Sequence, residues 1–226
     1  MGEVWAIVVA AGSGSRFGGA VPKQFLDLAG RRLVDWAVGA AAAVCDGVIA
    51  VLPPAQLGTA FDRPEAGAGA GRVAAVAGGA TRSASVRAGL AAVPDDAEIV
   101  VVHDAARPLA GAELFERVVA AVRAGADGAV PGVVVPDTIK RVDASGGRVV
   151  ETLDRPALRA IQTPQAFSAA ILRRAHAGSA DATDDAALVE ALGASVVVVD
   201  GDPANLKITG PDDLGRAEAL LARRPR

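Results

Sequence analysis

The sequence contains little of the chemistry on which many binding sites depend. Its 226 residues include one cysteine, two histidines, no tyrosine and only 3% aromatic residues. One cysteine excludes a disulfide framework and a cysteine-built zinc site, and two histidines leave little for a histidine-rich metal centre. The scarcity of aromatic side chains argues against a surface on which single-stranded nucleic acid stacks. The core must consist mainly of Ala, Val and Leu, which suits helices packed closely on a buried parallel sheet.

The chain also lacks a strong charge of either sign. Its formal net charge of −3 excludes a nucleic-acid binder that works through a bulk positive field, although a local basic pocket remains possible. The start, MGEVWAIVVAAG, has no basic segment, and its apolar run of about six residues is too short for a signal-peptide core or a membrane span. We therefore expect a soluble, cytoplasmic protein without a nucleic-acid or membrane partner.

Short β-branched runs alternate with Ala- and Leu-rich stretches along the chain. The runs are continuously apolar, as expected for strands covered on both faces, and span residues 4–9, 47–52, 73–77, 99–102, 130–135 and 196–199. The candidate helices are 33–44, 83–92, 112–123, 184–192 and 212–222. Because strands and helices alternate, we predict one α/β domain over residues 1–226, with a mostly parallel, doubly wound sheet flanked by helices.

Two of these helices begin at recognisable signals. Thr183 is the expected N-cap ahead of Asp184 and Asp185, whose charges suit the positive end of the helix dipole. Pro211, after Gly210, stands at a helix entry, where its missing N–H is not needed.

Two segments interrupt the alternation. Residues 53–71 are rich in Ala, Gly and Pro and are expected to form a loop with a short helix. Residues 140–153 read KRVDASGGRVVETL, which predicts two short strands around a Ser-Gly-Gly turn. A projecting hairpin leaves unpaired strand edges, so we expect an arm over about residues 138–158 that packs on a second subunit. An ordinary surface hairpin is the alternative.

A glycine-rich loop, AAGSGSRFGG, follows the first expected strand and could bring backbone N–H groups close to phosphates. Gly12 and Gly14 match the first two glycines of the dinucleotide-binding pattern, but Phe17 occupies the third position, and no Gly-Lys-Ser/Thr completes a P-loop. Arg16 and Lys23 strengthen the phosphate interpretation, because Arg offers a fork of donors and Lys a point charge. A tight structural turn remains the alternative.

A second motif, HDAARP, stands at the carboxyl end of an expected strand, where ligands bind in open α/β sheets. Asp104 suits a ribose hydroxyl or a magnesium-bound water, and Arg107 suits a phosphate. The alternative for Asp104 is a helix cap or a local turn. We interpret His103 as a hydrogen-bonded structural histidine rather than a metal ligand or general base.

A third motif, GGATRSAS, also lies between a strand and a helix. Its glycines, its hydroxyls and Arg82 suit an anion or the edge of a base at a helix N-terminus. For Ser83, capping the helix is an equally good interpretation.

Weaker polar motifs follow at other element ends. DTIK, DR, TPQ and NLKIT contain Thr138, Arg155, Thr163 and Lys207, of which the two cations are further candidate phosphate contacts. An acidic chain that concentrates cations at strand-end loops is typical of an enzyme acting on polyphosphates. Cys45 lies in an Ala-rich stretch expected to be helical and has no basic neighbour, so we interpret it as a core residue and not a nucleophile.

Together these motifs resemble those of a known family. VVAAGSGSRFGGAVPKQF, GGATRSASV, HDAARP, DTIKR, TPQAF and NLKIT occur in the same order as in the 2-C-methyl-D-erythritol 4-phosphate cytidylyltransferases, nucleotidyltransferases of the non-mevalonate isoprenoid pathway. The match runs from about Val4 to Thr209 and covers most of the chain. The resemblance implies a Rossmann-like nucleotidyltransferase fold with a projecting β-arm that forms a homodimer.

The resemblance also assigns roles to individual residues. It implies that Arg16 and Lys23 stabilise the transition state at the CTP phosphates, that Lys207 contacts the acceptor phosphate, and that Arg155 reaches the neighbouring subunit's site to do the same. These are the implied catalytic residues. The implied CTP-binding residues are Ala10, Ala11, Gly12, Gly14, Gly78, Gly79, Ser85, Asp104 and Ala105. The implied acceptor-binding residues are Arg82, Arg107, Thr138, Thr163 and Thr183.

The implied cofactor is Mg²⁺ bound with CTP, and no residue but Asp104 suggests itself as a protein ligand. The chain departs from some members at Ala80 and Ala204, where those members carry Asp. Neither departure changes one of the implied catalytic arginines or lysines.

The resemblance implies that CTP and 2-C-methyl-D-erythritol 4-phosphate yield 4-diphosphocytidyl-2-C-methyl-D-erythritol and pyrophosphate. A ribitol 5-phosphate cytidylyltransferase is the nearest alternative and shares the mechanism. A glycosyltransferase would be expected to carry a D-x-D metal motif, where this chain has D-A-A. A non-catalytic nucleotide-binding module would not need so many cations at separate strand ends.

Overall fold

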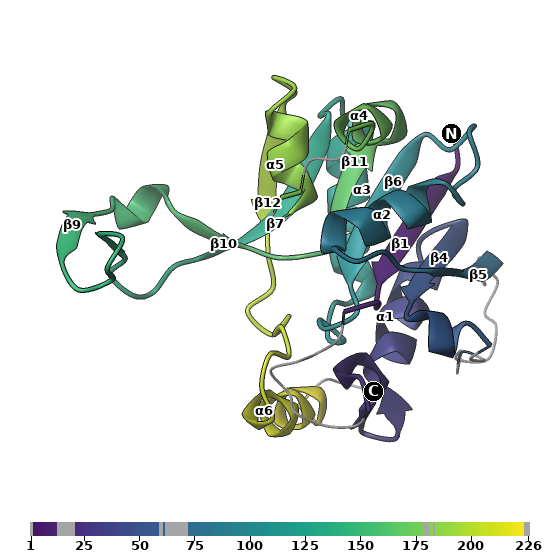
Figure 1. Ribbon diagram of the computed structural model, residues 1–226, viewed down its shortest axis with the longest axis horizontal. Helices are drawn as coiled ribbons and strands as arrows, with labels where there is room; N and C mark the ends of the chain where they lie inside the picture. The colour runs from purple at the N-terminus through teal and green to yellow at the C-terminus, as the bar shows by residue number, and fades with distance from the viewer. Residues whose placement is uncertain are drawn as a thin grey trace.

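The computed structural model describes residues 2–12, 21–58, 61, 72–178, 181–182 and 184–223. At its centre is an eight-stranded, mostly parallel sheet in the order β10-β7-β11-β6-β1-β4-β5, with β12 also paired to β7 (Figure 1). Its strands are β1 (Val4–Val9), β4 (Gly47–Leu52), β5 (Arg72–Ala77), β6 (Ile99–Asp104), β7 (Gly128–Val134), β10 (Arg159–Ile161), β11 (Gln165–Ser168) and β12 (Val196–Asp200). The pairings of β10 and β11 with β6 and β7 are antiparallel, and the other pairings in this sheet are parallel. The predicted α/β class and sheet are confirmed.

Helices cover both faces of the sheet. They are α1 (Leu33–Ala42), α2 (Arg82–Leu90), α3 (Ala112–Arg123), α4 (Ala169–Ala175), α5 (Asp185–Glu190) and α6 (Asp212–Leu221). Because alternate side chains of a strand point to opposite faces, Val4, Ala6 and Val8 of β1 pack with α1 and α3, whereas Trp5 and Ile7 pack with α2, α4 and α5. The remaining helix, α6, packs in a separate cluster with Leu28, Leu33, Leu109 and Ile208.

Short elements connect the layers and build the arm. Among the described residues, 3₁₀ turns occur at η2 (Lys23–Phe25), η3 (Pro54–Gln56) and η4 (Arg155–Ala157), and β2 (Asp27–Leu28) pairs with β3 (Arg31–Arg32). The predicted hairpin is present as β8 (Lys140–Val142) and β9 (Val149–Thr152), which project away from the sheet (Figure 1). Its turn contains Gly146 at φ +74°, a conformation that favours glycine. The exposed apolar side chains on this arm include Val142 (46%), Val149 (55%) and Val150 (57%).

Several local expectations were wrong. The N-cap of α5 is Asp184, whose Oδ1 accepts from the Ala187 N–H at 3.0 Å, and Thr183 lies outside the described residues. The N-cap of α2 is Thr81, whose Oγ1 accepts from the Ala84 N–H at 3.1 Å, so Ser83 does not cap this helix. Cys45 is buried as expected but follows the end of α1, and burial raises its pKa to about 12.

Three elements of the structure, β10, β11 and α4, are not predicted from the sequence. Part of the 53–71 segment lies outside the described residues, and η3 is its short helix. Within the described ranges, the helices are all too short or too polar to cross a bilayer.

Gly89 tests the contact between α2 and the sheet. A Cβ at this position would lie 2.6 Å from Ile7 Cγ2 and 3.1 Å from Val51 Cγ2. We expect Gly89→Ala to destabilise the fold by about 1–3 kcal/mol through overpacking, despite alanine's better helix propensity. Urea unfolding followed by circular dichroism measures the change. The matched control is Gly215→Ala in α6. A Cβ at Gly215 would meet no atom within 4 Å apart from its chain neighbours and the backbone of its own helix, so this change should be neutral or stabilising. Equal effects at both positions would contradict the prediction.

Candidate active site

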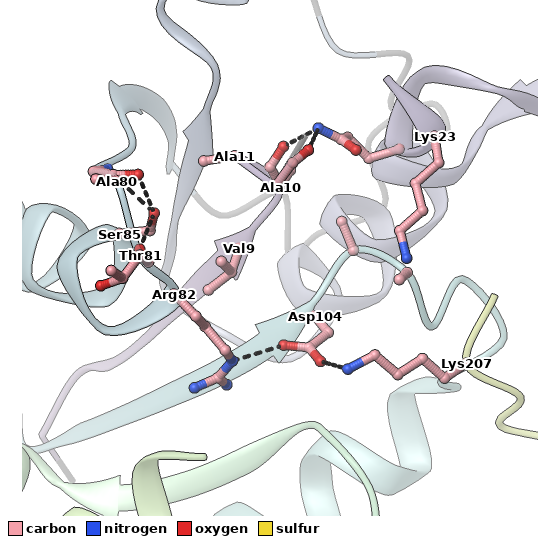
Figure 2. Close-up of a pocket in the computed structure, with 15 residues that line it drawn as sticks. Val9, Ala10, Ala11, Lys23, Ala80, Thr81, Arg82, Ser85, Asp104 and Lys207 are labelled. Atoms are coloured by element: carbon pink, nitrogen blue, oxygen red, sulfur yellow. Dashed lines mark hydrogen bonds and ion pairs between the residues drawn. The ribbon is translucent and has the colours of Figure 1, made fainter. Parts of the chain in front are cut away.

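A cavity of about 450 Å³ opens at the carboxyl ends of β1 and β6, beside the first turn of α2 (Figure 2). Ligands in open α/β sheets bind at this edge. Its described lining consists of Val9, Ala10, Ala11, Gly12, Lys23, Gln24, Gly79, Ala80, Thr81, Arg82, Ser85, Asp104, Ala105, Ala106 and Lys207. The motifs that follow β1, β5 and β6 therefore meet in one place, as their positions after parallel strands predict.

Most of the residues singled out in the sequence meet here. Those lining the cavity are Ala10, Ala11, Gly12, Lys23, Gly79, Arg82, Ser85, Asp104, Ala105 and Lys207. Arg16, Gly14 and Thr183 lie outside the described residues. The others, which are not among the described lining residues, are Gly78, Arg107, Thr138, Arg155 and Thr163.

Asp104 is the electrostatic centre of the cavity. Its Oδ2 accepts from Lys207 Nζ at 2.7 Å, and its Oδ1 lies 3.4 Å from Arg82 Nε (Figure 2). Burial alone would raise the pKa of this carboxyl, but the charges of Arg82 and Lys207 outweigh burial and hold its pKa well below the usual range. Asp104 is therefore ionised at neutral pH and orients two cations that line the cavity.

Lys23 and Gln24 join the first loop to the opposite wall. Lys23 Nζ donates to the backbone carbonyl of Ile208 at 2.9 Å. The buried amide of Gln24 donates to the carbonyls of Ala10 and Gly12, the latter at 3.0 Å. No role for Gln24 is predicted from the sequence, although it stands in the VPKQF run beside Lys23. A buried polar side chain there fixes the beginning of the glycine-rich loop.

The double glycine after β5 permits close packing of two loops. A Cβ on Gly78 would lie 2.1 Å from the Cβ of Ala11, so only glycine allows this approach. The Gly79 N–H donates to Ser85 Oγ at 3.2 Å. Gly78 thus allows the two loops to pack together without lining the cavity, whereas Gly79 and Ser85 line it.

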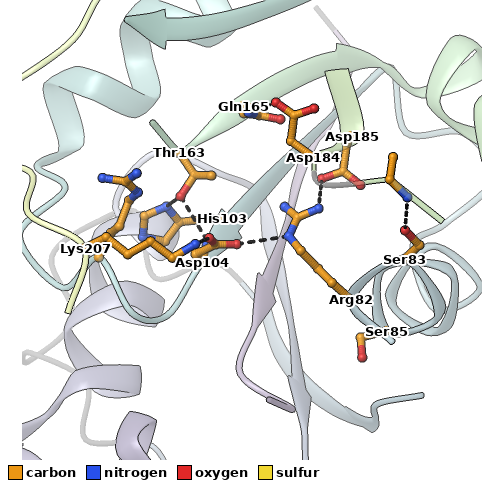
Figure 3. Close-up of polar contacts among 12 residues, drawn as sticks. Arg82, Ser83, Ser85, His103, Asp104, Thr163, Gln165, Asp184, Asp185 and Lys207 are labelled. Atoms are coloured by element: carbon orange, nitrogen blue, oxygen red, sulfur yellow. Dashed lines mark hydrogen bonds and ion pairs between the residues drawn. The ribbon is translucent and has the colours of Figure 1, made fainter. Parts of the chain in front are cut away.

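Behind Asp104, Thr163 and His103 form a buried support (Figure 3). The Asp104 N–H donates to Thr163 Oγ1 at 3.0 Å, and that hydroxyl lies 3.1 Å from His103 Nδ1. Burial lowers the pKa of His103 to about 4, which keeps the ring neutral at physiological pH. His103 is structural, as predicted, and Thr163 holds the backbone of Asp104.

Arg107 holds the segment that carries Lys207. Its Nη1 donates to the carbonyl of Asn205 at 2.8 Å, and the neighbouring Ala106 carbonyl accepts from the Ile208 N–H at 2.7 Å. Arg107 therefore contributes to the placement of Lys207. A contact between Arg107 and phosphate stays a prediction.

The two arm residues lie away from this chain's cavity. Thr138 is exposed, and Arg155 Nη1 donates to the carbonyl of Pro136 at 2.8 Å. Contacts between these residues and a partner subunit's site stay predictions.

Comparison with known proteins decides the family. A family model described as "IspD: 2-C-methyl-D-erythritol 4-phosphate cytidylyltransferase" matches residues 4–223. The chain belongs to this family. It is 49% identical to 2-C-methyl-D-erythritol 4-phosphate cytidylyltransferase of Nocardia farcinica, over 99% of this chain and 96% of that protein. The family confirms the predicted class of enzyme, a nucleotidyltransferase that transfers a cytidylyl group.

Solved structures agree with the fold. The crystal structure of 4-diphosphocytidyl-2C-methyl-D-erythritol synthase from Anaerococcus prevotii has a TM-score of 0.81 at 30% identity, covering 98% of this chain and 99% of that one. The Thermus thermophilus 2-C-methyl-D-erythritol 4-phosphate cytidylyltransferase has a TM-score of 0.77 at 38% identity, covering 97% and 99%. These values place the chain among the structures of the family.

His103 gives the fold a pH dependence. Because the folded chain keeps this ring neutral down to a pKa of about 4 and the unfolded chain protonates it near pH 6.5, acid favours the unfolded state. We expect its contribution to lower the free energy of unfolding by up to about 3 kcal/mol between pH 6.5 and pH 4. Urea unfolding across this range should show a shallower pH slope for His103→Asn than for the parent chain. Parallel slopes would contradict the assignment.

Proposed function

We propose that the cavity joins CTP to 2-C-methyl-D-erythritol 4-phosphate, giving 4-diphosphocytidyl-2-C-methyl-D-erythritol and pyrophosphate. The observation that supports this assignment is that Lys23, Arg82 and Lys207 line one cavity together with Gly12, and that Arg82 and Lys207 pair there with Asp104. Cations from separate loops suit two substrates that both carry phosphate. Two relatives named for the same reaction, from Nocardia farcinica and Rhodococcus opacus, match 99% and 97% of the chain.

The transfer needs charge stabilisation more than acid–base catalysis. An oxygen of the acceptor phosphate attacks the α-phosphorus of CTP, a new P–O bond forms, and the bond to the β-phosphate breaks with its electrons leaving on pyrophosphate. The acceptor phosphate is already an anion at neutral pH, so no general base is required. The described lining contains no histidine or cysteine, which fits this mechanism. The remaining barrier is repulsion between anions, which positioned cations lower.

The cavity suggests a division of roles. Lys23, together with Arg16, would neutralise charge on the CTP phosphates, because both belong to the glycine-rich segment. Gly79 and Ser85 would receive the base, and Arg82 and Lys207, which both pair with Asp104, would bind the acceptor phosphate. Arg107 and Thr163 would act through their neighbours, since Arg107 holds the backbone at Asn205 and Thr163 that of Asp104.

A magnesium ion fits this site only as a partner of the triphosphate. Across the described residues no group of three His, Cys, Asp or Glu side chains could hold a metal. Asp104 is ionised and lines the cavity, which suits Mg²⁺, an ion commonly bound through one or two carboxylates plus substrate phosphates. When bound, the ion would supply further neutralisation of phosphate charge.

The arm would complete the site across a homodimer. Its valines are exposed, and Arg155 lies in η4, which follows β9 on the arm. In a two-fold dimer each arm would meet the partner's body, so each subunit would lend Arg155 to the other.

Lys23→Ala tests the electrostatic role. We expect kcat to fall about a hundredfold or more, as for loss of a preorganised charge contact. Pyrophosphate release from CTP and Mg²⁺ is measured with 2-C-methyl-D-erythritol 4-phosphate and, in parallel, with ribitol 5-phosphate, the alternative acceptor. Arg216→Ala on the exposed face of α6 is the matched loss of a cation and should retain full activity. A folded Lys23→Ala chain with near-parent rate would overturn the role, and faster release with ribitol 5-phosphate would overturn the acceptor.

Mixed dimers test the role of Arg155. Lys23→Ala and Arg155→Ala homodimers should both be nearly inactive, because each has one defect in every site. After subunit exchange, a mixed dimer would place both defects in one site and leave the other intact. We expect about a quarter of the parent activity to return after random mixing of equal amounts. If Arg155 serves its own subunit, every site keeps one defect and no activity returns.

A further inference from the structure

A buried carboxylate lies directly behind Arg82. Asp185, at the start of α5, is 1% exposed in its side chain, and its Oδ2 forms an ion pair with Arg82 Nη1 at 2.8 Å (Figure 3). Its other oxygen, Oδ1, lies 2.9 Å from Nε2 of His176, which is 2% exposed at the end of α4. The sequence pattern predicts Asp185 only as a first-turn acid of the helix, and it indicates no role for His176.

Arg82 is thereby held between two carboxylates. Nη1 meets Asp185 on the buried side, and Nε meets Asp104 at 3.4 Å on the cavity side. Burial alone would lower the pKa of Arg82, but Asp185 and Asp104 more than offset burial and raise its pKa. A charged carboxylate at the depth of Asp185 is stable only when it is paired, so the pair fixes both partners.

Residues 181–182, which precede α5, also form hydrogen bonds with the first turn of α2. Thr81 Oγ1 donates to Asp181 Oδ1 at 2.8 Å, and the Ala182 N–H donates to Ser83 Oγ at 3.3 Å. These contacts flank the Arg82–Asp185 pair. The first turn of α2 is thus held against residues 181–182 through Thr81 and Ser83, the two neighbours of Arg82 in the sequence.

We propose that Asp185, supported by His176, is a positioning residue that holds the Arg82 guanidinium at the cavity wall so that it can bind the acceptor phosphate. The acceptor part of this inference rests on the proposed function. Without the negative charge of Asp185, Arg82 has Asp104 as its nearest carboxylate and would turn towards it, in competition with Lys207. The guanidinium would then be neutralised inside the cavity instead of behind it, and would offer less charge to an incoming anion.

A double-mutant cycle tests this arrangement. Asp185→Asn keeps the shape of the side chain and removes its charge. We expect KM for 2-C-methyl-D-erythritol 4-phosphate to rise about tenfold or more, with the Kd of CTP changed less than about twofold. Arg82→Gln should show a similar rise, and adding Asp185→Asn to it should cost little more, because the carboxylate acts through the guanidinium. Additive losses in the double variant, or an unchanged KM in folded Asp185→Asn, would overturn the proposal.

Arg173→Gln is the matched structural control. Arg173 lies on α4, and its guanidinium donates to the carbonyls of Leu90, Val93 and Pro94, at the opposite end of α2 from the turn that lines the cavity. This variant should lower the midpoint of thermal unfolding without changing KM. A rise in KM equal to that of Asp185→Asn would mean that both act through stability alone, and would overturn the positioning role.

A measurement without substrate separates this proposal from the proposed function. The Nε–Hε resonance of Arg82 in the ¹⁵N spectrum, assigned by its loss in Arg82→Gln, should shift in Asp185→Asn and stay in place in Arg173→Gln. An unmoved resonance in Asp185→Asn would overturn the positioning role. If the resonance shifts while the parent chain releases no pyrophosphate with the acceptor, the positioning of Arg82 stands and the proposed function fails.

Discussion

The carboxylate of Asp104 is held between Lys207 and Arg82, and the arrangement of the cavity depends on that contact. Each of these residues comes from a different segment: the end of β6, the loop before α6 and the first turn of α2. A carboxylate at this depth would be unstable without the two cations, and the cations would repel each other without it. The ion pairs therefore assemble the site as well as stabilise the fold.

The supports of this contact are mostly uncharged. Thr163 receives the Asp104 N–H, Arg107 holds the backbone of Asn205, and Gln24 holds the carbonyls of Ala10 and Gly12. These contacts fix the main chain of the loops that surround the cavity, which would otherwise be free to take several conformations. The positions of the loops are thus set largely by hydrogen bonds to the backbone, while Arg82 and Lys207 interact through their charges.

Much of this arrangement could be predicted from the sequence, because it follows from local patterns. Continuous apolar runs located the parallel strands, and the polar motifs after residues 9, 77 and 102 had to meet at one edge of a parallel sheet. The four residues of β11 could not be predicted, since QAFS has no run of β-branched residues and its strand exists only through pairing with β6 and β7. The arm was predictable from its turn, Ser-Gly-Gly, which needs no long-range contact.

The residues missed in the site share one property. Gln24 and Asp185 are polar and buried, and each contacts residues that are distant in the sequence. Their local sequence therefore carries no signal of their role. In the sequence, Asp185 satisfies the ordinary rule for acids at a helix start, and that explanation conceals its long-range pair with Arg82. Sequence patterns identify groups that face a ligand more readily than those that hold such groups from behind.

The weak overall charge of the chain is compatible with a strongly cationic cavity. The formal net charge is −3, yet the described lining carries Lys23, Arg82 and Lys207 against the single carboxylate of Asp104. Two anionic substrates must approach each other closely for phosphoryl transfer, and a field confined to the cavity favours their binding there without attracting polyanions to the whole surface. The pair between Arg82 and Asp185 on the buried side helps to maintain the positive field of the cavity. It fixes the Arg82 guanidinium, so that Asp104 does not have to neutralise this cation alone and also pairs with Lys207. The absence of histidine and cysteine from the described lining is compatible with the same chemistry, since a reaction between anions needs fixed positive charge and has little use for a nucleophile or a proton carrier.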